Sequence, residues 1–317
     1  MRFGYHNSAF VGADGGQPFQ AVLDRARRLE DAGFDLITFM DHVWQLRHNG
    51  RRDDPFFDCY TTLPAVAAVT DRVELSALVT SVGYRNPALL SKMLATLDHA
   101  SDGRAVLGIG AGWYEAEYDA YGYEYPEPET RVHQLRDAVR IAKAMWTEDS
   151  PVTYRGEHFV VEDAILEPKP LADPHPPVMV GGGGEQLTLR VVAEHADRWN
   201  VPMVDPETYE HKLAVLADHC EAVGRDYDEI TKTVLARALI RETAEEAHDY
   251  YESFAEASEG EPVPREEFRG MVGTPEDAAA LVGRFQDLGA EMVMIAVPRN
   301  DEETIERFAD DVLPQFA

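Results

Sequence analysis

Residues 84–122 decide the fold and read YRNPALLSKMLATLDHASDGRAVLGIGAGWYEAEYDAYG. Asn86 is a good helix N-cap, and Pro87 suits the first helical position, where no amide hydrogen is needed. The apolar run 105–109 then predicts a buried strand. A helix before such a strand, with a glycine-rich loop after it, is typical of a parallel sheet whose sites form where strands end.

The same alternation of apolar runs and amphipathic segments extends over almost the whole chain. Eight strands, each followed by a helix, predict an α/β protein with a (β/α)8 (TIM) barrel, and a doubly wound sheet is the main alternative. We expect a single domain over residues 1–317. The predicted strands are residues 2–6, 36–39, 73–80, 105–109, 178–180, 198–201, 231–239 and 292–297. The predicted helices are residues 19–32, 59–70, 87–101, 130–146, 186–195, 207–223, 244–257, 275–288 and 301–312.

An insertion around residues 147–177 interrupts this alternation. Residues 152–161 predict a β-hairpin with a turn at Arg155-Gly156, and a proline-rich run follows them. We therefore expect the barrel to carry a hairpin and an extended connection before its fifth strand.

The charge of the chain limits its partners. Asp and Glu number 58 against 29 Lys and Arg, which leaves a net charge of −29. Such a field repels nucleic acid and anionic membranes, and no apolar run approaches the roughly 20 residues of a membrane-spanning helix. Two cysteines, Cys59 and Cys220, are too few for a disulfide framework and indicate a reducing cytoplasm. The scattered acidic residues predict a halophilic protein, adapted to a salt-rich cytoplasm in which counter-ions screen the repulsion.

Asp41 and His42 are the candidate catalytic residues. They follow the predicted strand 36–39, so their side chains are expected at its C-terminal end, where the catalytic groups of barrels lie. His42 could carry a proton near neutral pH or hydrogen-bond a ligand, with Asp41 orienting it. The alternative is that Asp41 caps a turn and His42 only packs. Trp44 could form a wall for a planar cofactor or cover the core, and both interpretations stay open.

Two glycine-rich segments are candidate cofactor sites. Gly108, Gly110 and Gly112 do not open the helix of an early βαβ unit, as a dinucleotide fingerprint requires, so we favour close backbone contact with a flat ring over a mere tight turn. Residues 181–184 are four consecutive glycines between a strand and a helix, and their amide hydrogens at the positive end of the helix suit a phosphate. A merely flexible connection is the alternative. The histidines show no metal-ligand spacing, so no metal site is expected; they include His99, His133, His158 and His195.

With these motifs assembled, the chain resembles the bacterial-luciferase-like superfamily, in its branch of oxidoreductases that use the deazaflavin coenzyme F420. The resemblance runs over nearly the whole chain. It implies a (β/α)8 barrel with insertions, usually a homodimer, that holds the ring system at its C-terminal mouth. Further motifs that carry it are Ala32-Gly33-Phe34, Glu115-Ala116-Glu117, Tyr121-Gly122 and Gly273-Thr274-Pro275-Glu276.

The resemblance also implies site residues. A bulge with a non-proline cis peptide near Ala77-Leu78 would support the ring from behind, and Asp41 and His42 would lie beside its reactive edge. The residues that would touch the cofactor's ring or its phosphate are Ala77, Leu78, Ala111, Gly112, Gly182, Gly183 and Gly184.

One departure from the branch bears on the substrate. Its sugar-phosphate dehydrogenases carry a glutamate general acid directly after the Gly-x-Gly-x-Gly strand end, where this chain has Trp113. Glucose-6-phosphate oxidation is therefore not expected. Trp113 and Tyr114 are instead expected to shape an apolar substrate pocket, to which Trp44 is also assigned.

The predicted protein is a cytoplasmic, homodimeric F420-dependent oxidoreductase that moves a hydride between C5 of the deazaflavin and a small organic substrate. An FMN-dependent monooxygenase supplied with reduced flavin by a partner reductase is the first alternative. A non-catalytic flavin-binding barrel is the second. A nicotinamide dehydrogenase comes last, because a proper dinucleotide fingerprint is missing.

Overall fold

The computed structural model describes residues 1–10, 18–47, 49–257 and 270–316. They belong to two compact units. The first unit comprises Met1–Val73, Val201–His211 and Lys232–Ala317, and the second comprises Glu74–Asn200 and Lys212–Thr231.

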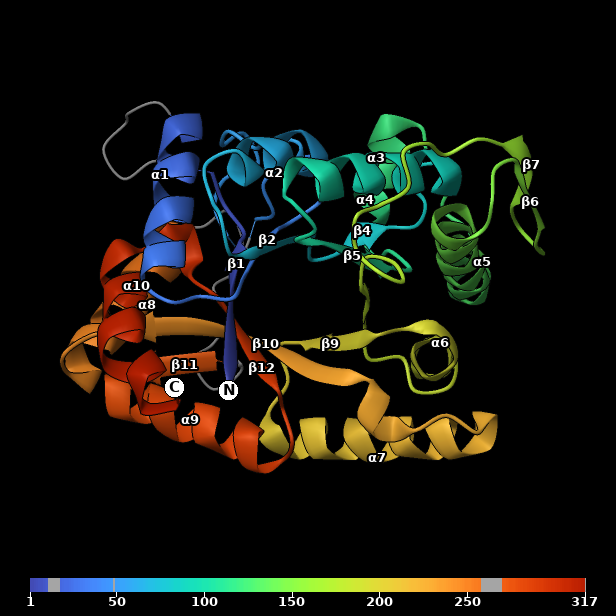
Figure 1. Cartoon of the computed structure of the whole chain (residues 1–317). Helices are drawn as coiled ribbons and strands as arrows, with labels where there is room; N and C mark the ends of the chain where they lie inside the picture. Colours follow the sequence, from blue (N-terminus) through green and yellow to red (C-terminus); the bar gives the residue numbers. More distant parts are fainter. Residues whose placement is uncertain (11–17, 48, 258–269, 317) are drawn as a thin grey trace. The chain divides into compact units, whose positions relative to one another are not determined.

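A parallel sheet in the order β11-β10-β12-β1-β2 runs through the first unit (Figure 1). All five residues of β12 are buried, which is the pattern of a parallel strand covered on both faces. The strands are β1 (Arg2–Asn7), β2 (Leu36–Phe39), β10 (Thr231–Ile240), β11 (Gly270–Gly273) and β12 (Met292–Ala296).

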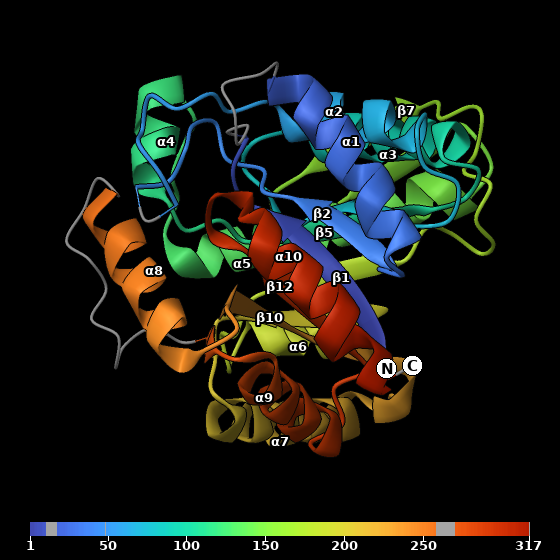
Figure 2. The same cartoon turned by 90° about the vertical axis from the view of Figure 1, so that its left-hand side faces the viewer.

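Helices α1 and α10 of the first unit lie side by side (Figure 2). Glu302 on α10 forms ion pairs with Arg25 at 3.6 Å and with Arg28 at 2.8 Å, both on α1. Helix α9 begins with a capping box, in which Thr274 and Asp277 each accept a hydrogen bond from the other's backbone amide. The helices of this unit are α1 (Pro18–Asp31), α2 (Cys59–Ala67), α8 (Ala244–Ala257), α9 (Pro275–Asp287), α10 (Glu302–Arg307) and the first turns of α7 (Pro206–Val223).

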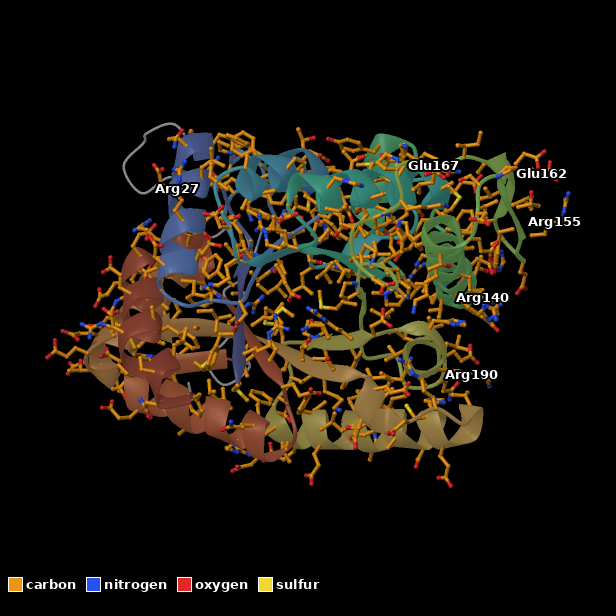
Figure 3. All side chains as sticks on the ribbon, in the orientation of Figure 1. Arg27, Arg140, Arg155, Glu162, Glu167 and Arg190 are labelled. Carbon is orange, nitrogen blue, oxygen red and sulfur yellow. The ribbon has the colours of Figure 1, made fainter. Side chains whose placement is uncertain are left out.

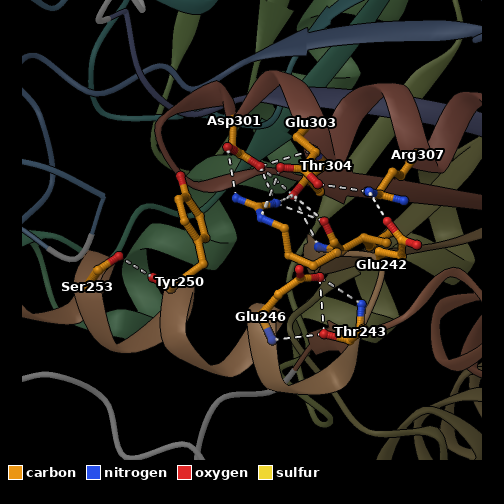
Figure 4. Close-up of polar contacts among 11 residues, drawn as sticks. Glu242, Thr243, Glu246, Tyr250, Ser253, Asp301, Glu303, Thr304 and Arg307 are labelled. Carbon is orange, nitrogen blue, oxygen red and sulfur yellow. Dashed lines mark hydrogen bonds and ion pairs between the residues drawn. The ribbon is translucent and has the colours of Figure 1, made fainter.

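A polar cluster ties the end of β10 to α8 and α10 (Figure 4). Arg241 donates to Asp301 at 2.8 Å and to Thr304 Oγ1 at 3.0 Å, and its guanidinium lies 3.9 Å from the ring centroid of Tyr250. Although burial works in the opposite direction, the hydrogen bonds from Arg241 and Thr304 hold the pKa of Asp301 below its usual value. Burial, together with the charge of Asp301, raises the pKa of Tyr250 to about 12, so its phenol stays protonated in this cluster.

The second unit contains a parallel sheet whose central strand is β5 (Ala105–Gly110). On one side β5 pairs with β3 (Glu74–Ala77) and then β4 (Thr80–Ser81), and on the other with β8 (Val178–Gly181), which pairs with β9 (Arg198–Pro202). Strands β3 and β4 are the two halves of the predicted strand 73–80, interrupted by the cis peptide Leu78-Val79. The sequence analysis placed this bond near Ala77-Leu78, one residue earlier.

The capping predicted at Asn86 is confirmed. Its side chain accepts hydrogen bonds from the amides of Ala88 at 3.0 Å and Leu89 at 3.3 Å, and Pro87 is the first residue of α3. Trp146 of α5 donates to the carbonyl of Ser91 on α3 at 3.0 Å, which joins these two helices. The helices of this unit are α3 (Pro87–Ala100), α4 (Glu115–Tyr121), α5 (Pro128–Thr147), α6 (Thr188–His195) and the rest of α7.

The predicted hairpin is present as the antiparallel strands β6 (Val152–Arg155) and β7 (Val160–Ala164). Each predicted strand and helix has a counterpart, with ends shifted by a few residues. The short elements β11 and α4 were not predicted, and α4, with seven residues, makes too few turns for a clear helical periodicity. Among the described helices, none is long and apolar enough to cross a membrane.

Candidate active site

In the first unit, His6 and Thr38 lie opposite each other near the C-terminal ends of β1 and β2. His6 Nδ1 lies 3.0 Å from Thr38 Oγ1, and only 2% of His6 is exposed. Burial lowers the pKa of His6 to about 3, and the charge of His42 contributes in the same direction. His6 is therefore a neutral imidazole at physiological pH.

Asp41 and His42 follow β2, as predicted, with Asp41 buried and His42 half-buried. His42 follows β2, the strand that pairs with the strand carrying His6. Their place at the C-terminal end of adjacent parallel strands is where barrels carry catalytic groups. The sequence analysis did not single out His6. The polar residues His6 and Asn7 at the end of an apolar strand could have indicated a site there.

Trp44 is half-buried, and the Arg52 guanidinium lies 4.3 Å from its ring centroid. One face of the indole is therefore covered by a cation of the chain itself.

In the second unit, the interruption between β3 and β4 packs against glycines of β5 and β8. A Cβ atom at Gly110 or at Gly181 would lie 2.8 Å from a methyl carbon of Val79, and one at Gly108 would lie 1.9 Å from the carbonyl oxygen of Ala77. The space that a side chain at Gly108 or Gly110 would take is filled by the chain itself. Glycine is required there because any side chain would displace the segment 77–79.

Gly112 has a φ of +79°, and a Cβ there would lie 2.2 Å from Ser81 Oγ and 2.4 Å from the Tyr118 hydroxyl. Ser81 and Tyr118 hydrogen-bond each other and so join β4 to α4. Glycine is therefore required at position 112, and both predicted ring-lining residues, Ala111 and Gly112, are half-buried.

Trp113 follows as an exposed side chain, with 62% of its surface accessible. Its ring centroid lies 5.1 Å from that of Tyr114, and the Tyr125 hydroxyl donates to its carbonyl at 2.9 Å. These contacts leave an aromatic pair directly after the glycine-rich strand end.

The glycine loop after β8 has the features of an anion site. Gly182 has a φ of +135° and is anchored at both backbone groups, because its amide donates to the Asn200 carbonyl at 2.9 Å and its carbonyl accepts from Trp199 Nε1 at 2.8 Å. Within the described part of the chain, the amides of Gly183 and Gly184 have no recorded partner. Helix α6 starts later than predicted, at Thr188, and no side chain caps it.

The carboxylate next to this loop, that of Glu185, is neutralised by a lysine. Glu185 forms an ion pair with Lys212 at 2.5 Å, and its carbonyl oxygen lies 2.7 Å from His219 Nε2. Because Lys212 neutralises this carboxylate, the loop keeps the positive character of unpaired amides. Amides of this kind at the start of a helix are the groups that bind an anion such as a phosphate.

The predicted residues fall into two groups. The first unit carries Asp41, His42 and Trp44, and the second unit carries all the others. The second group consists of Ala77, Leu78, Ala111, Gly112, Trp113, Gly182, Gly183 and Gly184.

The family model described as luciferase-like monooxygenase matches residues 1–267. The chain belongs to the luciferase-like monooxygenase family. The resemblance found in the sequence is therefore confirmed.

Relatives of this luciferase-like chain include both F420-dependent and FMN-dependent enzymes. The F420-dependent glucose-6-phosphate dehydrogenase of Kineococcus radiotolerans is 29% identical, over 99% of this chain and 96% of the relative. The FMNH(2)-dependent dimethylsulfone monooxygenase of Pseudomonas putida is 24% identical, over 92% of this chain and 87% of the relative.

The solved structure of an F420-dependent secondary alcohol dehydrogenase, in complex with an F420-acetone adduct, matches with a TM-score of 0.82 at 20% identity. The match covers 98% of each chain. The fold is therefore the (β/α)8 barrel of the luciferase-like family, as predicted, and the doubly wound alternative is wrong.

Proposed function

We propose that this protein is an F420-dependent oxidoreductase that acts on a small organic molecule. The glycine loop 181–184 carries the proposal, because two of its amides have no partner among the described residues and lie beside an uncapped helix start, the arrangement that binds phosphate. The choice of F420 is supported by full-length relatives and a fold neighbour that use it. Hydride transfer is the chemistry that F420 supplies at its C5 when bound.

In this proposal two parts of the second unit bind the cofactor. Ala77, Leu78, Ala111 and Gly112 hold the ring system, on backbone that the chain's own packing has fixed. The amides of Gly183 and Gly184 hold the phosphate, and Gly182, whose amide is bound to the Asn200 carbonyl, sets the course of the loop. A rigid support places the reacting ring and keeps water from it without a loss of conformational entropy at the moment of reaction.

We assign the proton transfer to His42, with Asp41 as its orienting partner. His6 is less suited to this role, because burial lowers its pKa to about 3 and so disfavours the protonated imidazole. His42 is half-buried and can exchange a proton with a substrate atom or with solvent. A neutral His6 on the adjacent strand also avoids a second positive charge when His42 is protonated.

The proposed substrate is a small molecule with apolar character. Trp113 and Tyr114 supply aromatic surface at the end of β5, and Trp44 is also proposed as a residue that contacts the substrate. Although several relatives are glucose-6-phosphate dehydrogenases, Trp113 occupies the place of the glutamate expected in them. We therefore propose that glucose-6-phosphate is not the substrate.

An FMN-dependent monooxygenase is the second candidate, since a relative of this family uses FMNH(2) over most of the chain length. Titration of the purified protein with F420 and with FMN, followed by quenching of cofactor fluorescence, separates the two. We expect F420 to bind with a micromolar or lower Kd and FMN to bind at least about tenfold more weakly. Tighter binding of FMN, with product formation that depends on oxygen, would instead identify the monooxygenase.

We also propose a homodimer that works in a salt-rich cytoplasm, and that binds neither nucleic acid nor membranes. The resemblance supports the dimer. The net charge of −29 supports the adaptation to salt and the lack of binding to nucleic acid and membranes. The melting temperature should rise as KCl is increased to molar concentrations, and a flat or falling profile contradicts the salt adaptation.

A further inference from the structure

Three potential metal ligands meet where the β6–β7 hairpin lies on α5. They are His133 on α5 and Glu157 and His158 in the hairpin turn, and one ligand atom of each lies within 4.8 Å of the other two. His133 Nδ1 is 3.8 Å from Glu157 Oε2, and His158 Nε2 is 3.8 Å from Glu157 Oε1. The two imidazole rings are stacked, with centroids 6.0 Å apart.

The turn that carries two of these ligands is fixed on α5 by other contacts. Asp137, one helical turn after His133, accepts the His158 amide hydrogen at 2.8 Å and the Tyr154 hydroxyl hydrogen at 3.2 Å. A Cβ at Gly156 would lie 2.4 Å from the same carboxylate, so the turn approaches α5 as closely as a backbone can. The three ligands are therefore brought together by packing that does not depend on them.

His158 Nε2 is buried, and it has no hydrogen-bond partner among the described residues. A buried nitrogen without a partner costs about 1–3 kcal/mol, so something usually satisfies it. The nearest polar group, the Glu157 carboxylate, is too far for a hydrogen bond. A cation between the two would satisfy both.

Arg136 orients the carboxylate of Glu157. Its guanidinium donates to Glu157 Oε2 at 3.0 Å, which leaves Oε1 as the oxygen facing His158. A carboxylate that binds a metal with one oxygen and accepts a hydrogen bond with the other is the usual arrangement around metal sites. The positive charge of Arg136 disfavours a cation nearby, but the net charge of −29 on the whole chain favours one.

We propose that His133, Glu157 and His158 bind a divalent transition-metal ion, with Zn²⁺ the best match, and that the ion fastens the β6–β7 hairpin to α5. Two imidazoles and one carboxylate are ligands of zinc, whereas Mg²⁺ and Ca²⁺ take oxygen ligands. Tetrahedral zinc holds such atoms about 3.3 Å apart, so small side-chain rotations complete the site, and water takes the fourth position.

The outer edge of the hairpin carries a different contact, the 2.5 Å ion pair of Arg155 and Glu162 (Figure 3).

The sequence analysis expected no metal site because it searched for local spacing. His133 belongs to a helix and His158 to a hairpin turn far along the chain, so no short motif contains both. In the described part of the chain, no other three His, Cys, Asp or Glu side chains meet in this way.

The test is calorimetric titration of the chelator-treated full-length protein with ZnCl2 in molar KCl, which suppresses weak binding to surface acids. We expect one Zn²⁺ per chain, no competition from excess Mg²⁺, and a higher melting temperature with Zn²⁺. His133→Asn and His158→Asn should each weaken Zn²⁺ binding by at least about tenfold and abolish the thermal shift. Glu157→Gln keeps both imidazoles and should weaken binding less.

His248→Asn is the matched control. His248 Nε2 and Glu252 Oε1 form an exposed pair at 3.2 Å on α8, with no third ligand among the described residues. This variant should bind Zn²⁺ as the wild type does. The proposal is overturned if the wild type binds no stoichiometric Zn²⁺, or if the His133 and His158 variants, shown to be folded by circular dichroism, bind it unchanged.

Discussion

The two glycine-rich segments of the second unit, 108–112 and 181–184, are alike in sequence and differ in what surrounds them. Gly108 and Gly110 are small because Ala77 and Val79 occupy the space beside them. The loop 181–184 instead keeps two amides without a recorded partner in the described chain, next to an uncapped helix. A glycine pattern therefore predicts that something approaches the backbone closely, and only the packing shows whether it is the chain or a ligand.

The largest effect is expected for Gly108→Ala. Because its Cβ would overlap the backbone carbonyl of Ala77, we expect unfolding to become easier by more than about 3 kcal/mol. Gly103→Ala is the control: its φ is +82°, but no atom lies within 4 Å of the added Cβ, so only the backbone strain of about 1 kcal/mol is expected. Urea denaturation measures both, and equal losses would show that the strand does not need glycine at 108.

The same contrast between packing and function separates two histidines, His6 and His42. His42→Ala should lower turnover by about a hundredfold and leave the melting temperature unchanged, because the half-buried ring is assigned to proton transfer and not to the core. Loss of deazaflavin absorbance, with the best substrate from a screen of small alcohols, measures turnover. Unchanged turnover removes His42 from the mechanism.

Gly182→Ala tests the second segment. Its φ of +135° strains any side chain, and the shifted loop should weaken F420 binding by about tenfold. Gly224→Ala, at φ +71° with open space around it, is the matched control and should bind F420 normally. If both variants bind F420 as the wild type does, the loop does not hold the cofactor.

A further prediction concerns the pH dependence of stability at His6. The pKa of His6 is about 3 in the folded chain against an ordinary value of 6.5. Below pH 6.5 the unfolded chain therefore takes up a proton that the folded chain refuses, and stability falls by up to about 1.4 kcal/mol per pH unit. His6→Gln removes this proton uptake by the unfolded chain. The free energy of unfolding of the variant, relative to that of the wild type, should therefore increase as the pH is lowered from 7 to 5. Parallel profiles would contradict the burial of a neutral His6.

The sequence predicts the elements that carry long periodic patterns, and misses what depends on distant neighbours. The strand 105–110 and the helix capped by Asn86 are visible because their signals are local. The packing of Ala77 on Gly108, and the meeting of His133 with His158, join residues that no local motif links. The candidate site was found from strand ends and a family resemblance, whereas the burial that makes His6 neutral needed the fold.

The most direct test of the account compares F420 with the same deazaflavin lacking its phosphate tail, both titrated against the wild type and Gly182→Ala. The account predicts that loss of the tail weakens binding to the wild type by at least about tenfold, and that Gly182→Ala then has no further effect on the shortened ligand. Equal affinity of the wild type for both ligands would contradict the assignment of residues 181–184 as the phosphate site.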